Sequence, residues 1–201
     1  MKKILFLHGF TSCGQCAIAQ TLADALKGWA EIIAPDLPIH PYKALELVRD
    51  VCHTEHPDLM VGSSCGAFYA QQLVKPENIP AILINPYFQM SEFLRTRIGI
   101  GRYKGPRRDG IQEFEVTPSL IEAYKEMEKW QFDHYDPSYR NKVWGLFGKR
   151  DTLAHFRDVF TQYYPETRDF DGNHTIEPEN VRLVLAPMIK EMMEYVETSG
   201  I

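Results

Sequence analysis

Short apolar runs recur along the chain, and most of them end at a turn residue. Residues 3–8 read KILFLH and stop at Gly9, and residues 80–84 read PAILI and stop at Asn85-Pro86. Runs of four to six apolar residues without alternation are typical of strands buried on both faces of a sheet. The pattern predicts six strands, the last of them weaker, at residues 3–8, 30–34, 58–62, 80–84, 143–148 and 167–170.

Between these runs, apolar residues recur three or four positions apart, which is the spacing of one helix face. Gly28 ends the first such segment, and Pro187 predicts a kink or split in the last. The predicted helices cover residues 15–27, 42–53, 65–74, 117–131, 153–164 and 178–197. Strands that alternate with helices in this way favour an α/β fold, with a mostly parallel sheet covered by helices on both faces.

One segment, residues 87–142, breaks the alternation. It shows no clear strand, contains the Gly-rich basic stretch GIGRYKGPRRDG, and separates the fourth and fifth predicted strands. An insertion there would sit above the carboxyl ends of the strands, where open α/β sheets bind ligands. We therefore expect a single domain over residues 1–201 with 87–142 as a helical cap or lid. An ordinary helical connection is the alternative, although loops of this length are uncommon without a role.

Composition and charge narrow the range of partners. Apolar residues make up 44% and charged residues 24% of the chain, as in globular proteins with a real core. The formal net charge of −5 argues against nucleic acid or an anionic membrane as partner. No apolar run approaches the roughly 20 residues of a membrane helix, and the start MKKILFLHGF is too short in apolar residues for a signal peptide. We expect a cytoplasmic protein that acts on a small molecule, and the sequence does not predict its oligomeric state.

The stretch DLMVGSSCGAFYA places Gly62-Ser63-Ser64-Cys65-Gly66 between a predicted strand and a predicted helix. It matches G-x-S-x-G, in which a strand turns so sharply into a helix that the middle side chain is held exposed. Small residues are needed two positions before and after, because strand and helix approach closely there. The pattern predicts Ser64 as a nucleophile and leaves Ser63 and Cys65 at variable positions. The alternative is a turn of small residues that only packs tightly.

A serine nucleophile needs a base and an orienting acid, which follow it along the chain in this kind of site. His174, in DFDGNHTI just past the last predicted strand, is the expected base, whereas His134 lies in the insertion and His155 in a predicted helix. Asp151, in the loop that ends VWGLFGKRDT, is the expected acid. Three other carboxylates compete with it as turn or surface residues: Asp136, Asp169 and Asp171.

Acyl transfer also needs hydrogen-bond donors for the oxyanion. The backbone N–H of Cys65, directly after the nucleophile, is one expected donor. The loop LHGFTS after the first strand supplies the other, with Phe10 the first choice and Thr11 the second. His8, in the same loop, is expected to be structural. Asn85, after the fourth strand, carries no charge and cannot serve as the acid.

Aromatic and basic residues are candidates for substrate contacts. Thr11, Tyr87 and Phe88 are the expected pocket residues, although core packing explains the two aromatic residues nearly as well. A basic patch would favour an anionic tail such as a phosphate or a coenzyme A moiety, but a solvated loop is the more common meaning of such a run. This patch consists of Lys104, Arg107 and Arg108.

The motifs FLHGF, GSSCGAFYA, INPYF, FGKRD and DGNH together resemble the α/β-hydrolase superfamily, and more closely the small bacterial YqiA-like esterases. The resemblance spans nearly the whole chain. It implies a three-layer fold with six or seven strands, hydrolysis of short-chain or aryl carboxylic esters or of acyl thioesters, and no cofactor. Two departures leave the substrate open: Cys65-Gly66-Ala67 stands where Leu-Gly-Gly is usual, and the insertion looks longer and more basic.

Two other classes of function stay open. Cys13 and Cys16 form a C-x-x-C at the start of a predicted helix, where a lowered thiol pKa is typical of redox proteins. No second cysteine or histidine pair completes a zinc site, so we predict no metal. The other alternative is a hydrolase-fold binding protein without catalysis, against which the complete set of Ser64, Asp151 and His174 argues.

Overall fold

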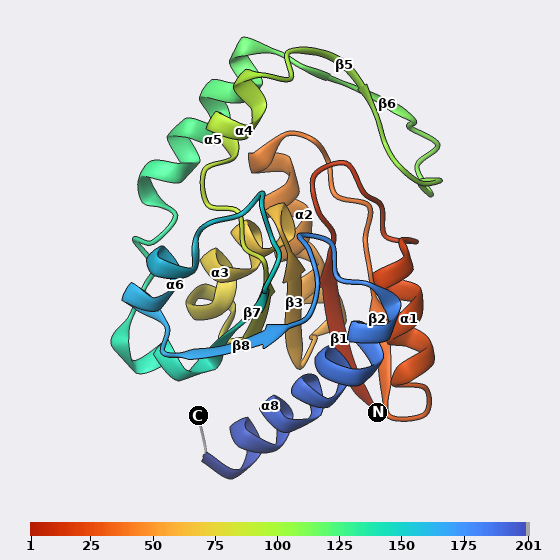
Figure 1. Cartoon of the computed structure of the whole chain (residues 1–201), viewed down its shortest axis with the longest axis vertical. Helices are drawn as coiled ribbons and strands as arrows, with labels where there is room; N and C mark the ends of the chain where they lie inside the picture. The colour runs from red at the N-terminus through yellow and green to blue at the C-terminus, as the bar shows by residue number, and fades with distance from the viewer. Residues whose placement is uncertain (200–201) are drawn as a thin grey trace.

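The computed structural model describes residues 1–199 and contains one parallel sheet of six strands in the order β2-β1-β3-β4-β7-β8 (Figure 1). Its strands are β1 (Lys2–Leu7), β2 (Ala30–Ile33), β3 (Leu59–Ser63), β4 (Ala81–Ile84), β7 (Val143–Gly148) and β8 (Glu166–Phe170). Each strand overlaps a strand that the sequence predicts, although β8, which reads ETRDF, has no apolar run. The predicted parallel α/β sheet of six or seven strands is therefore confirmed.

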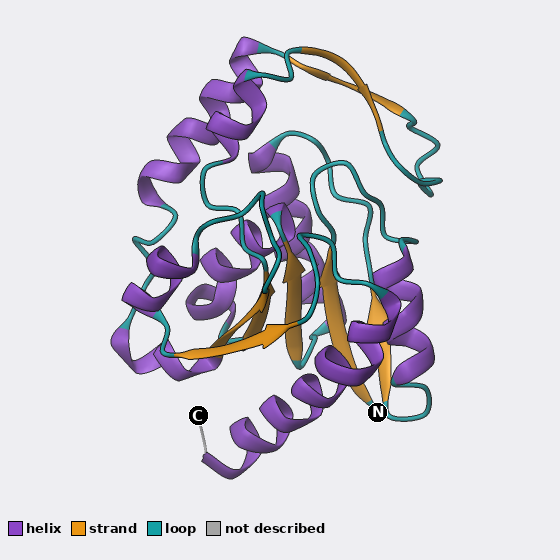
Figure 2. Cartoon of the chain, viewed as in Figure 1, coloured by secondary structure: helices purple, strands orange, loops and turns teal. Residues whose placement is uncertain are grey.

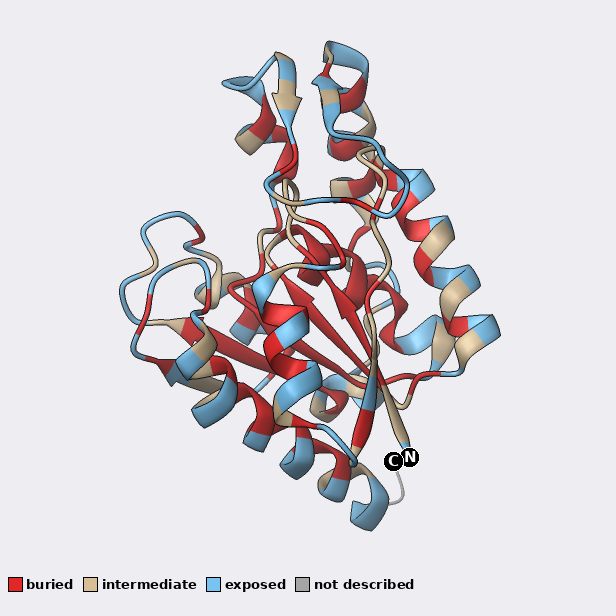
Figure 3. Ribbon diagram, turned by 90° about the vertical axis from the view of Figure 1, so that its right-hand side faces the viewer, coloured by how far each residue is buried: buried red, intermediate tan, exposed pale blue. Residues whose placement is uncertain are grey.

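Helices cover both faces of this sheet. Side chains alternate along β1, so that Ile4 and Phe6 pack on one face while Leu5 and Leu7 pack on the other. Figure 1 shows α8 in front of the strands and α2 and α3 behind them, and Figure 3 shows the strands buried between helices with exposed outer sides. The covering helices are α1 (Ala17–Ala25) and α8 (Ala186–Ser199) on the Ile4 side, and α2 (Pro41–Glu55) and α3 (Cys65–Glu77) on the Leu5 side.

The last helical segment changes its hydrogen-bonding pattern before Pro187. The short helix α7 (Pro178–Asn180) runs into a π-helical turn (Val181–Leu185), and α8 follows directly. Pro187 has no N–H to donate to the preceding turn, so the predicted interruption takes the form of this π turn. No helix within residues 1–199 is long and apolar enough to cross a membrane.

The order of the strands sets where a ligand would bind. From β1 the chain moves outward to β2, then crosses back to form β3 on the other side of β1. Ligands bind outside the carboxyl ends of the strands at such a reversal. The loop after β1 and the turn after β3, which contains Ser64, both begin at this point.

The segment 87–142 rises above the carboxyl ends of the strands (Figure 2). The expectation that it contains no clear strand is wrong, because β5 (Gly99–Arg102) and β6 (Glu113–Val116) form an antiparallel pair. These strands are short and half-exposed, so they lack the apolar runs that revealed the main sheet. Gly101 leaves room for the Phe114 ring, because a Cβ added to Gly101 would lie 2.5 Å from it. The elements of the segment 87–142 are α4 (Met90–Arg95), β5 (Gly99–Arg102), β6 (Glu113–Val116), α5 (Pro118–Trp130) and a 3₁₀ helix (Pro137–Lys142).

Arg107 fixes the loop between β5 and β6 against the body of the protein. Its guanidinium is buried, pairs with Asp109 at 2.6 Å and donates a hydrogen bond to the Leu37 carbonyl at 3.1 Å. It also lies over the Tyr103 ring, 4.1 Å from the centroid. The charge of Arg107 is therefore already engaged inside the protein, unlike that of a residue in a solvated loop.

Asp36 joins the same loop to the loop after β1. One carboxylate oxygen accepts the Gly14 N–H at 2.7 Å, and the other accepts the Arg108 N–H at 2.7 Å. The Arg108 guanidinium donates to the Ala34 carbonyl at 2.7 Å. Two members of the predicted basic patch, Arg107 and Arg108, thus hold the insertion in place.

His8 connects the loop after β1 to the segment after β2. Its Nδ1–H donates to the Gly9 carbonyl at 2.8 Å, and its Nε2 accepts the Leu37 N–H at 2.9 Å. Because the side chain is 2% exposed, burial lowers the pKa of His8 to about 4. A proton on Nε2 would also meet the Leu37 N–H head-on, so this contact requires the neutral ring.

Acidification should therefore destabilise the fold through His8. The unfolded chain takes up this proton near pH 6.5 and the folded protein only near pH 4, so unfolding binds a proton in between. We expect His8 to remove about 3 kcal/mol from the free energy of unfolding between these two pH values. Urea unfolding of the wild type and of His8→Gln at pH 7 and pH 4.5 measures this effect. The difference in the free energy of unfolding between the two proteins should shrink at pH 4.5. An equal difference at both pH values would contradict a neutral, buried His8.

Candidate active site

Ser64 occupies a strained turn at the end of β3. Its φ of 54° and ψ of −114° lie in a region that costs a non-glycine residue about 1–3 kcal/mol. The backbone holds this conformation, since the Ser64 N–H donates to the Ile84 carbonyl at 2.9 Å and the Ser64 carbonyl accepts the Ala67 N–H at 3.0 Å. Strain that is fixed in this way is frequent at functional sites.

The two glycines of the motif allow strand and helix to approach. A Cβ on Gly66 would lie 2.0 Å from the Leu7 carbonyl oxygen, and one on Gly62 would lie 2.6 Å from the backbone of Ala67. Both obstacles are backbone atoms that cannot move without shifting β1 or α3. The sequence motif therefore has the steric basis that was predicted for it.

The structure brings Ser64, His174 and Asp151 together. His174 Nε2 lies 2.9 Å from Ser64 Oγ, and His174 Nδ1 lies 2.8 Å from Asp151 Oδ2. The Asp151 side chain is 4% exposed and that of His174 is 19% exposed, so the acid lies behind the imidazole. In this arrangement Nδ1–H donates to the carboxylate, which leaves Nε2 to accept the serine proton.

Asp151 is held by its own loop. Its second oxygen, Oδ1, accepts the N–H groups of Leu153 at 2.7 Å and Ala154 at 3.0 Å. This turn occupies the residues before α6 (Arg157–Tyr163), which begins later than the predicted helix 153–164. The Asp151 carboxylate is therefore oriented by His174 at one oxygen and by its own loop at the other.

The competing residues have other partners. Asp169 and Asp171 form ion pairs with Arg157 and Arg150. Asp136 accepts the Ser138 N–H at 2.9 Å at the start of the 3₁₀ helix. His155 is exposed, with its Nε2 3.1 Å from the Thr152 carbonyl oxygen. None of these contacts brings its residue to Ser64.

Asn85 holds the histidine loop, a role that sequence reasoning missed. Its Nδ2 donates to the carbonyls of Asn173 at 3.1 Å and His174 at 2.8 Å, and its Oδ1 accepts the Gly148 N–H at 2.8 Å. The residue is 1% exposed and adopts a φ of 42°, which asparagine tolerates better than most residues. The available signal was its polar side chain at the carboxyl end of the apolar strand β4.

The two expected oxyanion donors lie at the start of α3 and in the loop after β1. Cys65 begins α3, so its N–H belongs to the first turn, where a helix has no internal partner for it. Phe10 lies in the turn after β1 that is closed by a hydrogen bond from the Ser12 N–H to the Gly9 carbonyl at 3.0 Å. Within residues 1–199, neither N–H donates a hydrogen bond to the protein.

The Cys65 thiol faces away from this chemistry. It is 2% exposed, and burial raises its pKa to about 12. Its sulfur lies 3.7 Å from the Tyr124 hydroxyl, which is itself 2.8 Å from the Tyr69 hydroxyl. A protonated, buried thiol of this kind acts as packing.

A cleft of about 250 Å³ adjoins Ser64 and His174. Thr11 lines it, in agreement with its predicted position in the pocket. Lys104, a member of the predicted basic patch, also lines the cleft. Sequence reasoning missed three apolar lining residues: Ile18, Phe93 and Leu153.

Neither of the two predicted aromatic pocket residues, Tyr87 and Phe88, is among the residues that line the cleft. The Tyr87 ring lies edge-on to His174, with 6.5 Å between ring centroids. Phe88 is 2% exposed and packs against Phe132 in the core, 5.2 Å between centroids, so it is not among the residues that line the cleft. Both rings also contact Phe156, at 5.0 Å and 5.8 Å between centroids.

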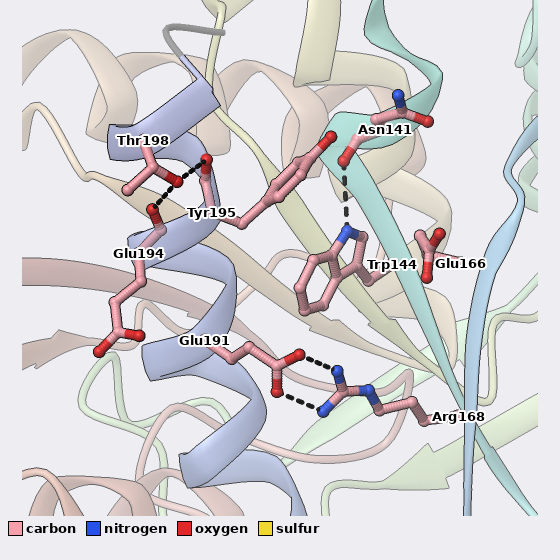
Figure 4. Close-up of a pocket in the computed structure, with 8 residues that line it drawn as sticks. All are labelled: Asn141, Trp144, Glu166, Arg168, Glu191, Glu194, Tyr195 and Thr198. Atoms are coloured by element: carbon pink, nitrogen blue, oxygen red, sulfur yellow. Dashed lines mark hydrogen bonds and ion pairs between the residues drawn. The ribbon is translucent and has the colours of Figure 1, made fainter.

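A larger hollow of about 500 Å³ lies between α8 and the amino ends of β7 and β8, at the opposite edge of the sheet (Figure 4). Four of its lining residues bind one another: Arg168 pairs with Glu191, and Trp144 Nε1 donates to the Asn141 carbonyl at 3.2 Å. It contains no serine or cysteine beside a histidine. The cleft at Ser64 is therefore the candidate active site despite its smaller volume.

The C-x-x-C has a packing role in this structure. Cys13 and Cys16 are free thiols, and burial raises the pKa of Cys13, the reverse of what a redox thiol needs. A Cβ on Gly105 would lie 2.8 Å from the Cys13 sulfur, so the insertion passes directly over it. In residues 1–199 no cluster of three histidine, cysteine or acidic side chains could hold a metal ion.

Gly66→Ala should disrupt the turn. The new Cβ would collide with the Leu7 carbonyl, and we expect the free energy of unfolding to fall by about 3 kcal/mol, the upper part of the usual range for overpacking. Gly9→Ala is the matched control, because its Cβ would lie 3.6 Å from the nearest atom, on Ser64, and should change stability by less than about 1 kcal/mol. If chemical denaturation showed the same loss of stability in Gly66→Ala and Gly9→Ala, the steric explanation of the turn would be contradicted.

Asn85→Asp should make stability depend on pH. The new carboxylate would face the carbonyls of Asn173 and His174, so the folded protein would hold its proton to higher pH than the unfolded chain does. We expect the variant to lose about 1–3 kcal/mol relative to wild type as the pH rises from 5 to 8. Denaturation at both pH values tests this, with Asn85→Ala as the variant whose loss should not depend on pH. A constant loss in Asn85→Asp would overturn the assigned hydrogen bonds.

Solved structures of known fold resemble the whole chain. Est1E from Butyrivibrio proteoclasticus, solved with ferulic acid bound, has a TM-score of 0.68 and 16% identity, over 96% of this chain and 90% of that one. The esterase domain of a Rhodothermus marinus protein has a TM-score of 0.67 and 16% identity, over 96% and 87%. A Pyrococcus furiosus esterase has a TM-score of 0.58 and 15% identity, over 96% and 81%. At these identities the likeness establishes the α/β-hydrolase fold and leaves the reaction open.

A family model covers most of the sequence. Residues 3–186 match the model described as "Uncharacterised protein family (UPF0227)". This match includes the turn at Ser64, the loop of Asp151 and the loop of His174. The chain belongs to the uncharacterised protein family UPF0227, the YqiA-like group that its motifs resemble.

Proposed function

We propose that this protein is a serine hydrolase of the carboxylesterase type, which cleaves carboxylic esters through an acyl-enzyme on Ser64. One observation carries the proposal: a continuous hydrogen-bonded chain from Ser64 Oγ through His174 to Asp151, with distances of 2.9 and 2.8 Å, at a strained turn. A binding protein without catalysis would have no need to maintain this strained and buried arrangement.

Acylation begins when Ser64 Oγ attacks the carbonyl carbon of the ester. Its proton passes to His174 Nε2, and the Asp151 carboxylate stabilises the imidazolium through Nδ1–H. The N–H groups of Phe10 and Cys65 donate to the negative oxygen of the tetrahedral intermediate. As the intermediate collapses, His174 returns the proton to the leaving alcohol, and the acyl group stays on Ser64.

Deacylation repeats these steps with water. His174 Nε2 takes a proton from a water molecule, whose oxygen attacks the acyl carbon, and the same two N–H groups hold the oxyanion. Collapse breaks the ester bond to Ser64, and His174 gives the proton back to Ser64 Oγ. The products are a carboxylic acid and the free enzyme.

The cleft favours small acyl groups. Its volume of about 250 Å³ is below the roughly 300–1,000 Å³ of sites for drug-sized ligands, and Phe93 and Leu153 supply apolar walls. We therefore propose short-chain or aryl esters as substrates, and the ferulic acid bound to Est1E is an aryl acid of that kind. Acyl thioesters would follow the same path, with a thiol as the leaving group.

We also propose that residues 87–142 act as a cap on a single domain. Phe93 and Lys104 of this segment line the cleft, and the hydrogen bonds of Arg107 and Asp36 fasten it over the sheet. The cytoplasmic location expected from the sequence stays a prediction.

Kinetics of the wild type and three variants test the proposed roles. With p-nitrophenyl acetate as substrate, Ser64→Ala and Asp151→Asn should each lower kcat by roughly 10³- to 10⁴-fold, because one removes the nucleophile and the other the orienting acid. Asp171→Asn is the matched control, since this carboxylate pairs with Arg150 at the surface, and it should leave kcat within about twofold of wild type. Turnover that persists in Ser64→Ala would refute the mechanism.

A further inference from the structure

Lys104 is the one cationic side chain, apart from the candidate base His174, among the residues that line the cleft at Ser64. It comes from the loop between β5 and β6, and its side chain is exposed. Within residues 1–199 its ammonium forms no ion pair and no hydrogen bond with the protein. The cation therefore stands at the candidate active site without a partner of its own.

The neighbouring cations of the insertion all have partners. Arg95 pairs with Glu92 at 3.1 Å, Arg102 with Glu113 at 3.2 Å, and Arg107 with Asp109 at 2.6 Å. Arg97 lies over the Phe93 ring, 3.7 Å from the centroid, and Arg108 donates to the Ala34 carbonyl. Lys104 differs from them both in its place at the cleft and in its free charge.

The lining of the cleft holds no compensating negative charge. No residue that lines it carries a carboxylate, and Asp151 is 4% exposed behind His174. The remaining walls are apolar or carry neutral hydroxyls. An anion that enters the cleft therefore meets the Lys104 cation without a competing carboxylate among the lining residues.

The position of Lys104 is fixed although its stem is flexible. Its N–H donates to the Thr11 carbonyl at 2.8 Å, which ties it to the loop of the Phe10 oxyanion donor. On one side Tyr103 is buried beneath Arg107, and on the other Gly105 lies against the Cys13 sulfur. The Lys104 side chain thus starts from a fixed point of the backbone and lines the same cleft as Ser64 and His174.

We propose that Lys104 is a specificity-determining residue and that the natural substrate is an ester with a negatively charged group, a carboxylate or a phosphate, close to the scissile bond. This inference rests on the proposed ester hydrolysis and names the class of its substrate. The anion binds the Lys104 ammonium while the ester carbonyl lies at Ser64. The charge sits on either the acyl or the alcohol part of the ester.

Two pairs of esters, each matched in shape and different in charge, show whether the charge sits on the acyl part or on the alcohol part. 4-Acetoxybenzoate and 4-acetoxybenzamide carry the difference on the alcohol part. The p-nitrophenyl monoester of adipic acid and its terminal amide carry it on the acyl part. The measured quantity is the ratio of kcat/KM for the charged ester to that for the neutral ester, in wild type and in Lys104→Met.

We expect this ratio to fall about three- to fivefold in Lys104→Met for at least one pair, which is the effect of a partly exposed charge pair, and to fall further in Lys104→Glu. Arg102→Met is the matched control, because it removes a cation from the same hairpin but outside the cleft, and its ratios should equal those of wild type. Unchanged ratios in Lys104→Met, or an equal fall in Arg102→Met, would overturn the proposal.

A binding measurement separates this proposal from the proposed reaction. Ser64→Ala protein is titrated with 4-acetoxybenzoate and 4-acetoxybenzamide, and with the two adipate esters, by nuclear magnetic resonance, which detects millimolar affinity without turnover. We expect tighter binding of the charged member of one pair, and loss of that preference when Lys104→Met is added. Equal affinities within both pairs while Lys104 is intact would overturn the anion site, whether or not the wild type hydrolyses esters.

Discussion

The close packing of α3 against β1 is the constraint on which the rest of the candidate site depends. Gly66 lies so near Leu7 that a Cβ would come within 2.0 Å of the carbonyl oxygen. For α3 to start this close to the sheet, β3 must turn into it within one residue, and Ser64 takes a φ of 54°. The same contact sets the loop of Phe10 beside the first turn of α3, which begins at Cys65. One packing requirement thus arranges the candidate nucleophile and both candidate oxyanion donors.

The candidate base and the candidate acid reach this point through the geometry of a parallel sheet. Carboxyl ends of parallel strands meet at one edge, so the loops after β7 and β8 arrive beside the turn after β3, although His174 is 110 residues from Ser64. Asn85, at the end of β4, then ties these two loops together through hydrogen bonds to their backbones. The sheet determines the approximate position of His174, and the hydrogen bonds of the buried Asn85 amide fix the backbone of its loop.

Much of this could be predicted from the sequence, because the features concerned leave local signals. Strands buried on both faces need apolar runs, and the sharp turn needs Gly62 and Gly66. The β5–β6 hairpin left no such signal, since its strands are short and half-exposed. The role of Asn85 was not predicted because its partners are backbone groups of distant loops. Lys104 and Arg107 look alike in one basic run, and only tertiary contacts distinguish a free cation from a buried ion pair.

Identification of the residue that reacts with a fluorophosphonate tests the central claim most directly. The folded protein is labelled, digested and sequenced by tandem mass spectrometry, which separates the neighbouring candidates Ser63, Ser64 and Cys65. The account predicts a single adduct on Ser64 Oγ, because only this side chain is exposed by the turn and hydrogen-bonded to His174. An adduct on Ser63 or Cys65, or a well-folded protein that takes no label, would contradict it.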